Sequence, residues 1–128
     1  MKASLIRLAS IFLLSGACAS AVVAAPVKLG VLTDISGVFS DLSGQGSVEA
    51  AKLAVEDVGG SVLGEKIEVV SADHQQKPDV GLSIARKWFD VEGVDVILDV
   101  PNSAIALAVN TLVKDKNKIA IYASAATD

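Results

Sequence analysis

Short apolar runs alternate along this chain with segments in which apolar residues recur at helical spacing. The runs are rich in Val, Ile and Leu and lack a clean polar alternation, which is typical of strands buried on both faces of a sheet. The four strands predicted in this way span residues 27–33, 67–72, 94–100 and 118–122.

The segments between these strands predict amphipathic helices over residues 46–58, 78–91 and 103–113. In the second helix, Val80, Ile84, Trp88 and Val91 fall on one face, so we expect this face, with Trp88, in the core. Strands alternating with helices predict an α/β fold, with a parallel sheet, right-handed crossovers and helices on both faces.

The first 24 residues are of a different kind. Lys2 and Arg7 precede an uncharged run over residues 8–23, and small residues lead up to Ala24. This three-part pattern is typical of a secretory signal peptide, and we expect cleavage after Ala24. Residues 25–128 would then form the mature domain.

Two other uses of this first segment stay open. One is a retained membrane anchor, although the uncharged run is short for that purpose. The other is a lipid anchor through Cys18, although Ser15 stands where the lipoprotein motif prefers Leu. If cleavage follows Ala24, the only Cys leaves with the signal, and the mature domain has no disulfide, Cys nucleophile or Cys metal ligand.

Composition excludes several classes of protein. The 128 residues are 52% hydrophobic, which argues against a disordered chain, and a single Cys argues against a disulfide scaffold. A formal net charge of −4 argues against a nucleic-acid partner, because phosphates attract a basic surface. A small globular unit held together by core packing remains.

Residues suited to catalysis or metal binding are few. His74 is the only His, and we interpret it as a solvated loop residue and predict no metal site. The Gly-x-Ser-x-Gly turn of many hydrolases is absent from the sequence, and residues 44–46 lack the third Gly of a dinucleotide loop. We therefore predict no enzyme, no catalytic residue and no cofactor, and keep an exported α/β hydrolase as an alternative.

Polar loops follow each predicted strand. Ligands of open parallel sheets bind at the carboxyl ends of the strands, and loops rich in Ser, Thr, Asn and Gly suit a small polar group or an anion at a helix N-terminus. Ser103 begins the third predicted helix and is the leading candidate, with a plain N-cap as the equal alternative. The four loops span residues 33–45, 73–78, 101–103 and 123–128.

Several motifs occur in a fixed order along residues 29–128. LGVLTDISGVFSDLSGQG comes first, followed by an A-x-x-A-V-E-D helix, a G-x-x-L-G-x-x-I turn and a D-x-x-x-x-P helix start. VDVILDVPNSAIALAV and KIAIYASAATD come last. Together they resemble the Leu/Ile/Val-binding family of periplasmic solute-binding proteins, which serve ABC importers. The resemblance implies a type I periplasmic-binding fold, whose two lobes close on a ligand about a hinge.

In that family the first lobe holds the carboxylate and amino group of an amino acid. The resemblance assigns this role to Ser103, Ala125 and Thr127. It also places Leu42, with Phe39 nearby, where an aromatic residue commonly packs on the ligand. We expect residues 25–128 to be the N-terminal lobe alone, from a longer protein.

The resemblance implies a periplasmic receptor that binds amino acids or related small carboxylate or amide solutes and delivers them to an ABC permease in the inner membrane. Leu42 and the Pro101-Asn102 pair depart from the pattern of branched-chain amino-acid receptors. The DHQQKPDV and RKWFD stretches resemble a subgroup of the family, and this resemblance implies aromatic acids or amides as substrates. A sensory ectodomain of the same fold is the alternative from another functional class.

Overall fold

The computed structural model describes residues 25–126. The predicted signal peptide, with Cys18 and the cleavage position after Ala24, lies outside the described residues, and so does Thr127. Among the described residues, none of the helices has both the length and the apolar character that a membrane crossing requires.

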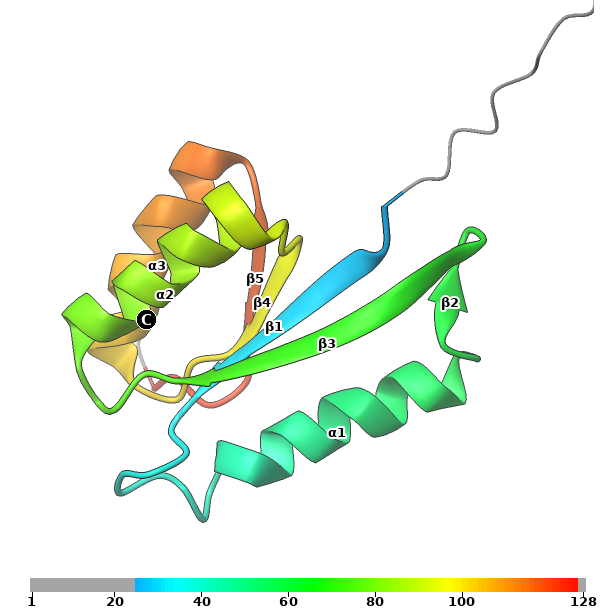
Figure 1. Cartoon of the computed structure of the whole chain (residues 1–128). Coiled ribbons are helices and arrows are strands. Elements are labelled where there is room, and N and C mark those ends of the chain that lie inside the picture. Colours follow the sequence, from blue (N-terminus) through cyan, green and yellow to red (C-terminus); the bar gives the residue numbers. More distant parts are fainter. Residues whose placement is uncertain (1–24, 127–128) are drawn as a thin grey trace, which may run out of the picture.

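Five strands form one twisted sheet in the order β2-β3-β1-β4-β5 (Figure 1). The strands β3, β1, β4 and β5 run parallel, and β2 pairs antiparallel with β3 at one edge. The strands are β1 (Val27–Thr33), β2 (Ser61–Val62), β3 (Glu65–Asp73), β4 (Val96–Asp99) and β5 (Ile119–Tyr122).

Helices cover both faces of this sheet, as the sequence predicts. On one face α1 (Gly44–Asp57) packs against β1 and β3, and on the other α2 (Pro78–Lys87) and α3 (Ser103–Lys116) pack against each other over the sheet (Figure 1). The apolar core lies beneath α2 and α3. It includes Leu32, Ala85, Trp88, Ile97, Ile105 and Val109.

The edge strand β2 is absent from the sequence prediction. Leu63 and Gly64 join it to β3, with φ angles of 51° and 85°. Positive φ at both central residues is the geometry of a type I′ turn, which suits a two-residue hairpin. A strand of two exposed residues has no apolar periodicity, so the sequence shows no sign of it.

The second predicted helix is wrong at its end. The helix α2 ends at Lys87, and residues Trp88–Glu92 form a single π-helical turn, η1. The N–H of Gly93 reaches back five residues to the carbonyl of Trp88, so the turn is wider than an α-helical one. Trp88 is buried as predicted, whereas the wider turn leaves Val91 76% exposed instead of in the core.

Candidate functional site

The carboxyl ends of the four parallel strands lie at one edge of the sheet, and the polar loops that follow them meet there (Figure 1). A hollow of about 450 Å³ opens between these loops; we call it the loop hollow. Four of the predicted binding residues line it, and the structure brings together segments as far apart in the sequence as Phe39 and Ala126. Its lining residues are Phe39, Leu42, Pro101, Asn102, Ser103, Ala104, Ser124 and Ala126.

Asn102 and Ser103 form the wall of the loop hollow at the start of α3. Asn102, not Ser103, is the N-cap: its Oδ1 accepts a hydrogen bond from the N–H of Ile105 at 3.1 Å. The Oγ of Ser103 instead accepts from the N–H of Ala126 at 3.2 Å. The plain N-cap interpretation of Ser103 is therefore wrong, and its hydroxyl keeps a proton to donate into the hollow.

The remaining predicted residues that the structure describes, Phe39, Leu42 and Ala125, differ in their exposure and in whether they line the loop hollow. Leu42 is 74% exposed and Phe39 is half-buried, both at the mouth of the loop hollow. Ala125 does not line the hollow: its side chain packs against the core, and the neighbouring Ala126 lines the hollow in its place.

The loop that carries Phe39 and Leu42 is held by a buried carboxylate that the sequence analysis missed. Asp34 follows β1 directly and is fully buried. Its two oxygens accept the N–H groups of Gly37 and Phe39, each at 2.8 Å. Asp and Asn commonly fold a turn onto themselves in this way, and an Asp three residues before a Gly after an apolar strand is the available signal.

A second buried carboxylate, on Asp99, ties together the ends of three strands. It accepts hydrogen bonds from Thr33 Oγ1 at 2.8 Å and from Ser124 Oγ at 3.0 Å. Asp99 and Val100 have φ angles of 79° and 56°, which are unfavourable for residues with a Cβ and most of all for a β-branched one. This bend ends β4 before its predicted limit and directs residues 101–103 toward the loop hollow.

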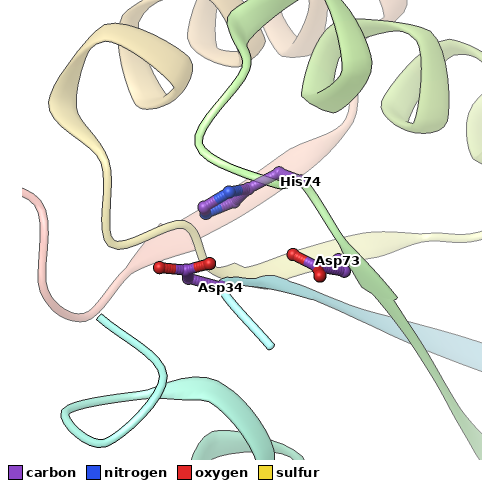
Figure 2. A group of neighbouring side chains, drawn as sticks. All are labelled: Asp34, Asp73 and His74. Carbon is purple, nitrogen blue, oxygen red and sulfur yellow. The ribbon is translucent and has the colours of Figure 1, made fainter. Parts of the chain in front are cut away.

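The prediction that His74 is solvated is wrong, because the side chain is fully buried. Its ring lies close to the carboxylates of Asp34 and Asp73 (Figure 2), with candidate ligand atoms of all three within 4.8 Å of one another. Its Nδ1 accepts from the N–H of Gln76 at 3.2 Å, and its Nε2 has no hydrogen-bond partner among the described residues. Burial lowers the pKa of His74 although Asp34, Asp73 and Asp99 oppose this, so the ring is neutral at pH 7.

The two carboxylates beside His74 are already engaged in holding loops. Asp73 accepts from the N–H groups of Gln75 and Ile35, at 2.8 and 3.2 Å, and from Ser36 Oγ at 2.6 Å. Partial burial raises the pKa of Asp73, but the hydrogen bonds from Ser36, Gln75 and Ile35 outweigh it and hold that pKa below its usual value. These hydrogen bonds make the cluster an anchor for the loops that follow β1 and β3.

Residues 26–128 match the model of the periplasmic binding protein family, which covers most of the chain. This chain belongs to the periplasmic binding protein family. The fold predicted for it, a parallel-sheet lobe of the type I periplasmic-binding architecture, is confirmed, with the antiparallel β2 as an addition.

Solved structures of periplasmic binding proteins share this fold. A periplasmic binding protein from Burkholderia mallei is 48% identical, with a TM-score of 0.79 over 80% of this chain and 28% of its own. A branched-chain amino acid ABC transporter periplasmic ligand-binding protein from Burkholderia xenovorans is 60% identical, with a TM-score of 0.77 over 79% of this chain and 27% of its own.

A third structure holds an aromatic acid. This solute-binding protein of an ABC transporter from Rhodopseudomonas palustris, in complex with 3,4-dihydroxybenzoic acid, is 26% identical, with a TM-score of 0.72 over 80% of this chain and 28% of its own. The chain thus spans less than a third of the length of these relatives. No curated protein matches it.

Proposed function

We propose that residues 25–128 are the N-terminal lobe of a periplasmic receptor that captures a small solute for an ABC importer, without catalysis. The observation that carries this proposal is the loop hollow, at the carboxyl edge of the parallel sheet, where ligands of open α/β sheets bind. Its mixed lining of apolar and hydroxyl-bearing side chains suits an orienting polar group beside an apolar body.

The first turn of α3 gives the loop hollow its preference for an anion. Ser103 and Ala104 line the hollow there, and the first N–H groups of a helix have no carbonyl partner within the helix. These N–H groups and the positive end of the helix dipole favour a negatively charged oxygen, and the Ser103 hydroxyl adds a donor. We therefore propose that the solute presents a carboxylate or a comparable polar group to this turn.

The chemical class of the solute is an amino acid or an aromatic acid. The Burkholderia xenovorans relative is named for branched-chain amino acids, and the Rhodopseudomonas palustris relative holds a dihydroxybenzoic acid. Phe39 and Leu42 at the mouth of the loop hollow would contact an aliphatic or an aromatic body equally. Thr127 and the backbone at Ala125 are proposed as further ligand contacts, as the resemblance implies.

Export completes the proposal. Residues 1–24 are proposed to direct the chain to the periplasm and to be removed after Ala24, with a lipid anchor at Cys18 as the alternative. The proposed partner is an ABC permease in the inner membrane.

A calorimetric titration tests the proposal, using a form of the protein that carries both lobes of the family fold. Branched-chain amino acids, benzoate, hydroxybenzoates and their amides are the ligand panel. We expect Ser103→Ala to weaken binding of the preferred solute by about 1–3 kcal/mol, because a buried polar group of the solute loses its donor.

Ser83→Ala is the matched control, since Ser83 is an exposed serine on α2 outside the loop hollow. Unchanged affinity in Ser103→Ala would move the site away from the first turn of α3. If no compound of the panel gives a binding heat, even at millimolar concentration, the protein is not a receptor for these carboxylate or amide solutes.

A further inference from the structure

The side-chain amide of Gln76 joins two of the loops that form the loop hollow. Its Nε2 donates to Asp34 Oδ2 at 2.6 Å, and its Oε1 accepts from Asn102 Nδ2 at 2.7 Å. We infer that Gln76 is a positioning residue for ligand binding: it sets the distance between the loop of Phe39 and the start of α3. This inference rests on the proposed function of the loop hollow.

The hydrogen bonds of Gln76 are the middle of a longer chain. Asp34 Oδ2 also accepts the N–H of Phe39 at 2.8 Å, and the Oδ1 of Asn102 caps α3 by accepting the N–H of Ile105 at 3.1 Å. An unbroken series of hydrogen bonds therefore runs from the backbone of Phe39 to the first turn of α3. Both of its ends lie at walls of the loop hollow, whereas Gln76 itself does not line it.

The chemistry of this position calls for an amide. An ionised Asp34 can only accept hydrogen bonds, and the Nδ2 of Asn102 can only donate them. The group between them must donate on one side and accept on the other, which a Gln amide does and a carboxylate does not. An apolar side chain of the same length fills the space but leaves both neighbours one hydrogen bond short.

The backbone conformation of the loop after β3 also directs the side chain of Gln76 toward Asp34 and Asn102. Gln75 and Gln76 have φ angles of 53° and 56°, a left-handed pair in the loop after β3. The N–H of Gln76 is fixed on Nδ1 of the buried His74. This conformation, which is unfavourable for residues with a Cβ, turns the side chain of Gln76 inward and leaves its neighbour Gln75 exposed.

Gln76→Glu is the decisive variant, because the protonation state of the introduced carboxyl group decides whether it can donate a hydrogen bond to Asp34. At neutral pH the introduced carboxylate faces Asp34 and cannot donate to it, so the two loops are pushed apart. When the introduced group is protonated, it donates to Asp34 and accepts from Asn102, as the amide does. A neighbouring carboxylate raises the pKa of such a group, which brings the switch toward the mildly acidic range.

The affinity for the preferred solute is measured by calorimetry between about pH 7.5 and about pH 5, on the form that carries both lobes. The affinity of each variant is divided by the affinity of the unmodified protein at the same pH. This ratio removes the effects that the titration of His74 and of the solute have on both proteins. We expect Gln76→Glu to bind at least about tenfold more weakly at the upper pH and to approach the unmodified protein at the lower pH.

Two further variants make the result specific. Gln76→Met keeps the length of the side chain without its hydrogen bonds, and we expect weakened binding at every pH, with no recovery in acid. Gln75→Glu adds the same charge at the exposed neighbour and should follow the unmodified protein throughout. Circular dichroism at each pH establishes that every variant is folded.

Equal binding by Gln76→Glu, Gln76→Met and the unmodified protein would overturn the positioning role and leave the proposed function standing. Weakened binding by folded Gln76→Glu that does not recover in acid would also overturn it, because the switch of hydrogen bonds would then not be the cause. If the unmodified protein itself binds no solute of the panel, the proposed function fails, and this inference fails with it.

Discussion

At the scale of single residues, buried polar side chains hold the loops around the loop hollow, and their surroundings set their charges. His74 illustrates this: it is fully buried, and burial lowers its pKa despite three nearby carboxylates, those of Asp34, Asp73 and Asp99. The neutral ring accepts the N–H of Gln76, which the protonated ring cannot do. Protonation of His74 therefore opposes the folded state.

The stability of the protein should depend on pH through this residue. In the unfolded chain His74 has its ordinary pKa of about 6.5, so below that pH the unfolded state binds a proton that the folded state resists. The contribution of His74 to the free energy of unfolding is therefore fully present above about pH 6.5 and is lost as the pH falls toward the lower folded-state pKa. Urea titrations at a series of pH values measure this slope.

His74→Gln provides the comparison, because it removes the only His of the sequence and keeps an acceptor for Gln76. We expect the variant to be less stable at pH 7 and to lose the slope between about pH 6.5 and about pH 5. Asp73, whose folded-state pKa is also lowered, contributes a separate loss of stability below its ordinary pKa of about 3.8. An unchanged slope in His74→Gln would contradict the assignment.

The sequence identified the residues that line the loop hollow and missed those that hold its loops in place. Asn102 and Ser103 could be placed because a strand end and a helix start are visible in the pattern of apolar residues. Phe39 and Leu42 were placed by the resemblance to the Leu/Ile/Val-binding family. Gln76, Asp99 and the burial of His74 could not be predicted, because a residue of this edge that packs against another loop has the same local sequence as one in water. Asp34 alone carried a signal, the Gly three residues after it. The N-cap prediction failed by one position, since Asn and Ser suit that role equally.

At the scale of elements, the close packing of α2 on α3 depends on a missing side chain. A Cβ added to Gly81 in α2 would lie 2.6 Å from Cγ2 of Ile105 in α3, which is far inside van der Waals contact. Ile105 is fully buried and cannot move aside without disturbing the core. Gly81 thus sets the separation of the two helices that cover one face of the sheet.

We expect Gly81→Ala to destabilise the protein by about 1–3 kcal/mol, although Ala is the better helix former. Gly46→Ala is the matched control: Gly46 lies in α1, and a Cβ there would have no atom within 4 Å. That change should stabilise the fold by about 0.4–1 kcal/mol. Chemical denaturation measures both, and a shift of the same sign in the two variants would contradict a packing role for Gly81.

Most elements were predictable because burial leaves a trace in the sequence. The buried strands β1 and β4 and the apolar faces of α2 and α3 carry that trace, and so does the order of strands and helices. The turn η1 could not be predicted, since Trp88 and Val91 fit a continuous helical pattern. The hairpin strand β2 could not be predicted for a different reason, because both of its residues are exposed.

At the scale of the whole molecule, the described residues form a lobe with an open side. The helix α1 packs against β1 and β3, and the strand β5 at the other edge keeps Ile119 and Ile121 more than half exposed. The loop hollow is likewise bounded by the loops of this lobe alone. A solute in the loop hollow would contact this lobe alone and would keep much of its surface in water.

This geometry predicts the behaviour of residues 25–128 produced alone. Ligand pockets that bind tightly bury most of the surface of a small ligand, and a single wall does not, so the apolar contribution to binding and the strength of each hydrogen bond both fall. We expect calorimetry to show at least about hundredfold weaker binding of the preferred solute than in a form with both lobes. Circular dichroism would establish that residues 25–128 are folded under the same conditions. Binding of equal strength by the two forms would mean that the first turn of α3 and its neighbours hold the solute without a facing lobe, and that closure adds no affinity.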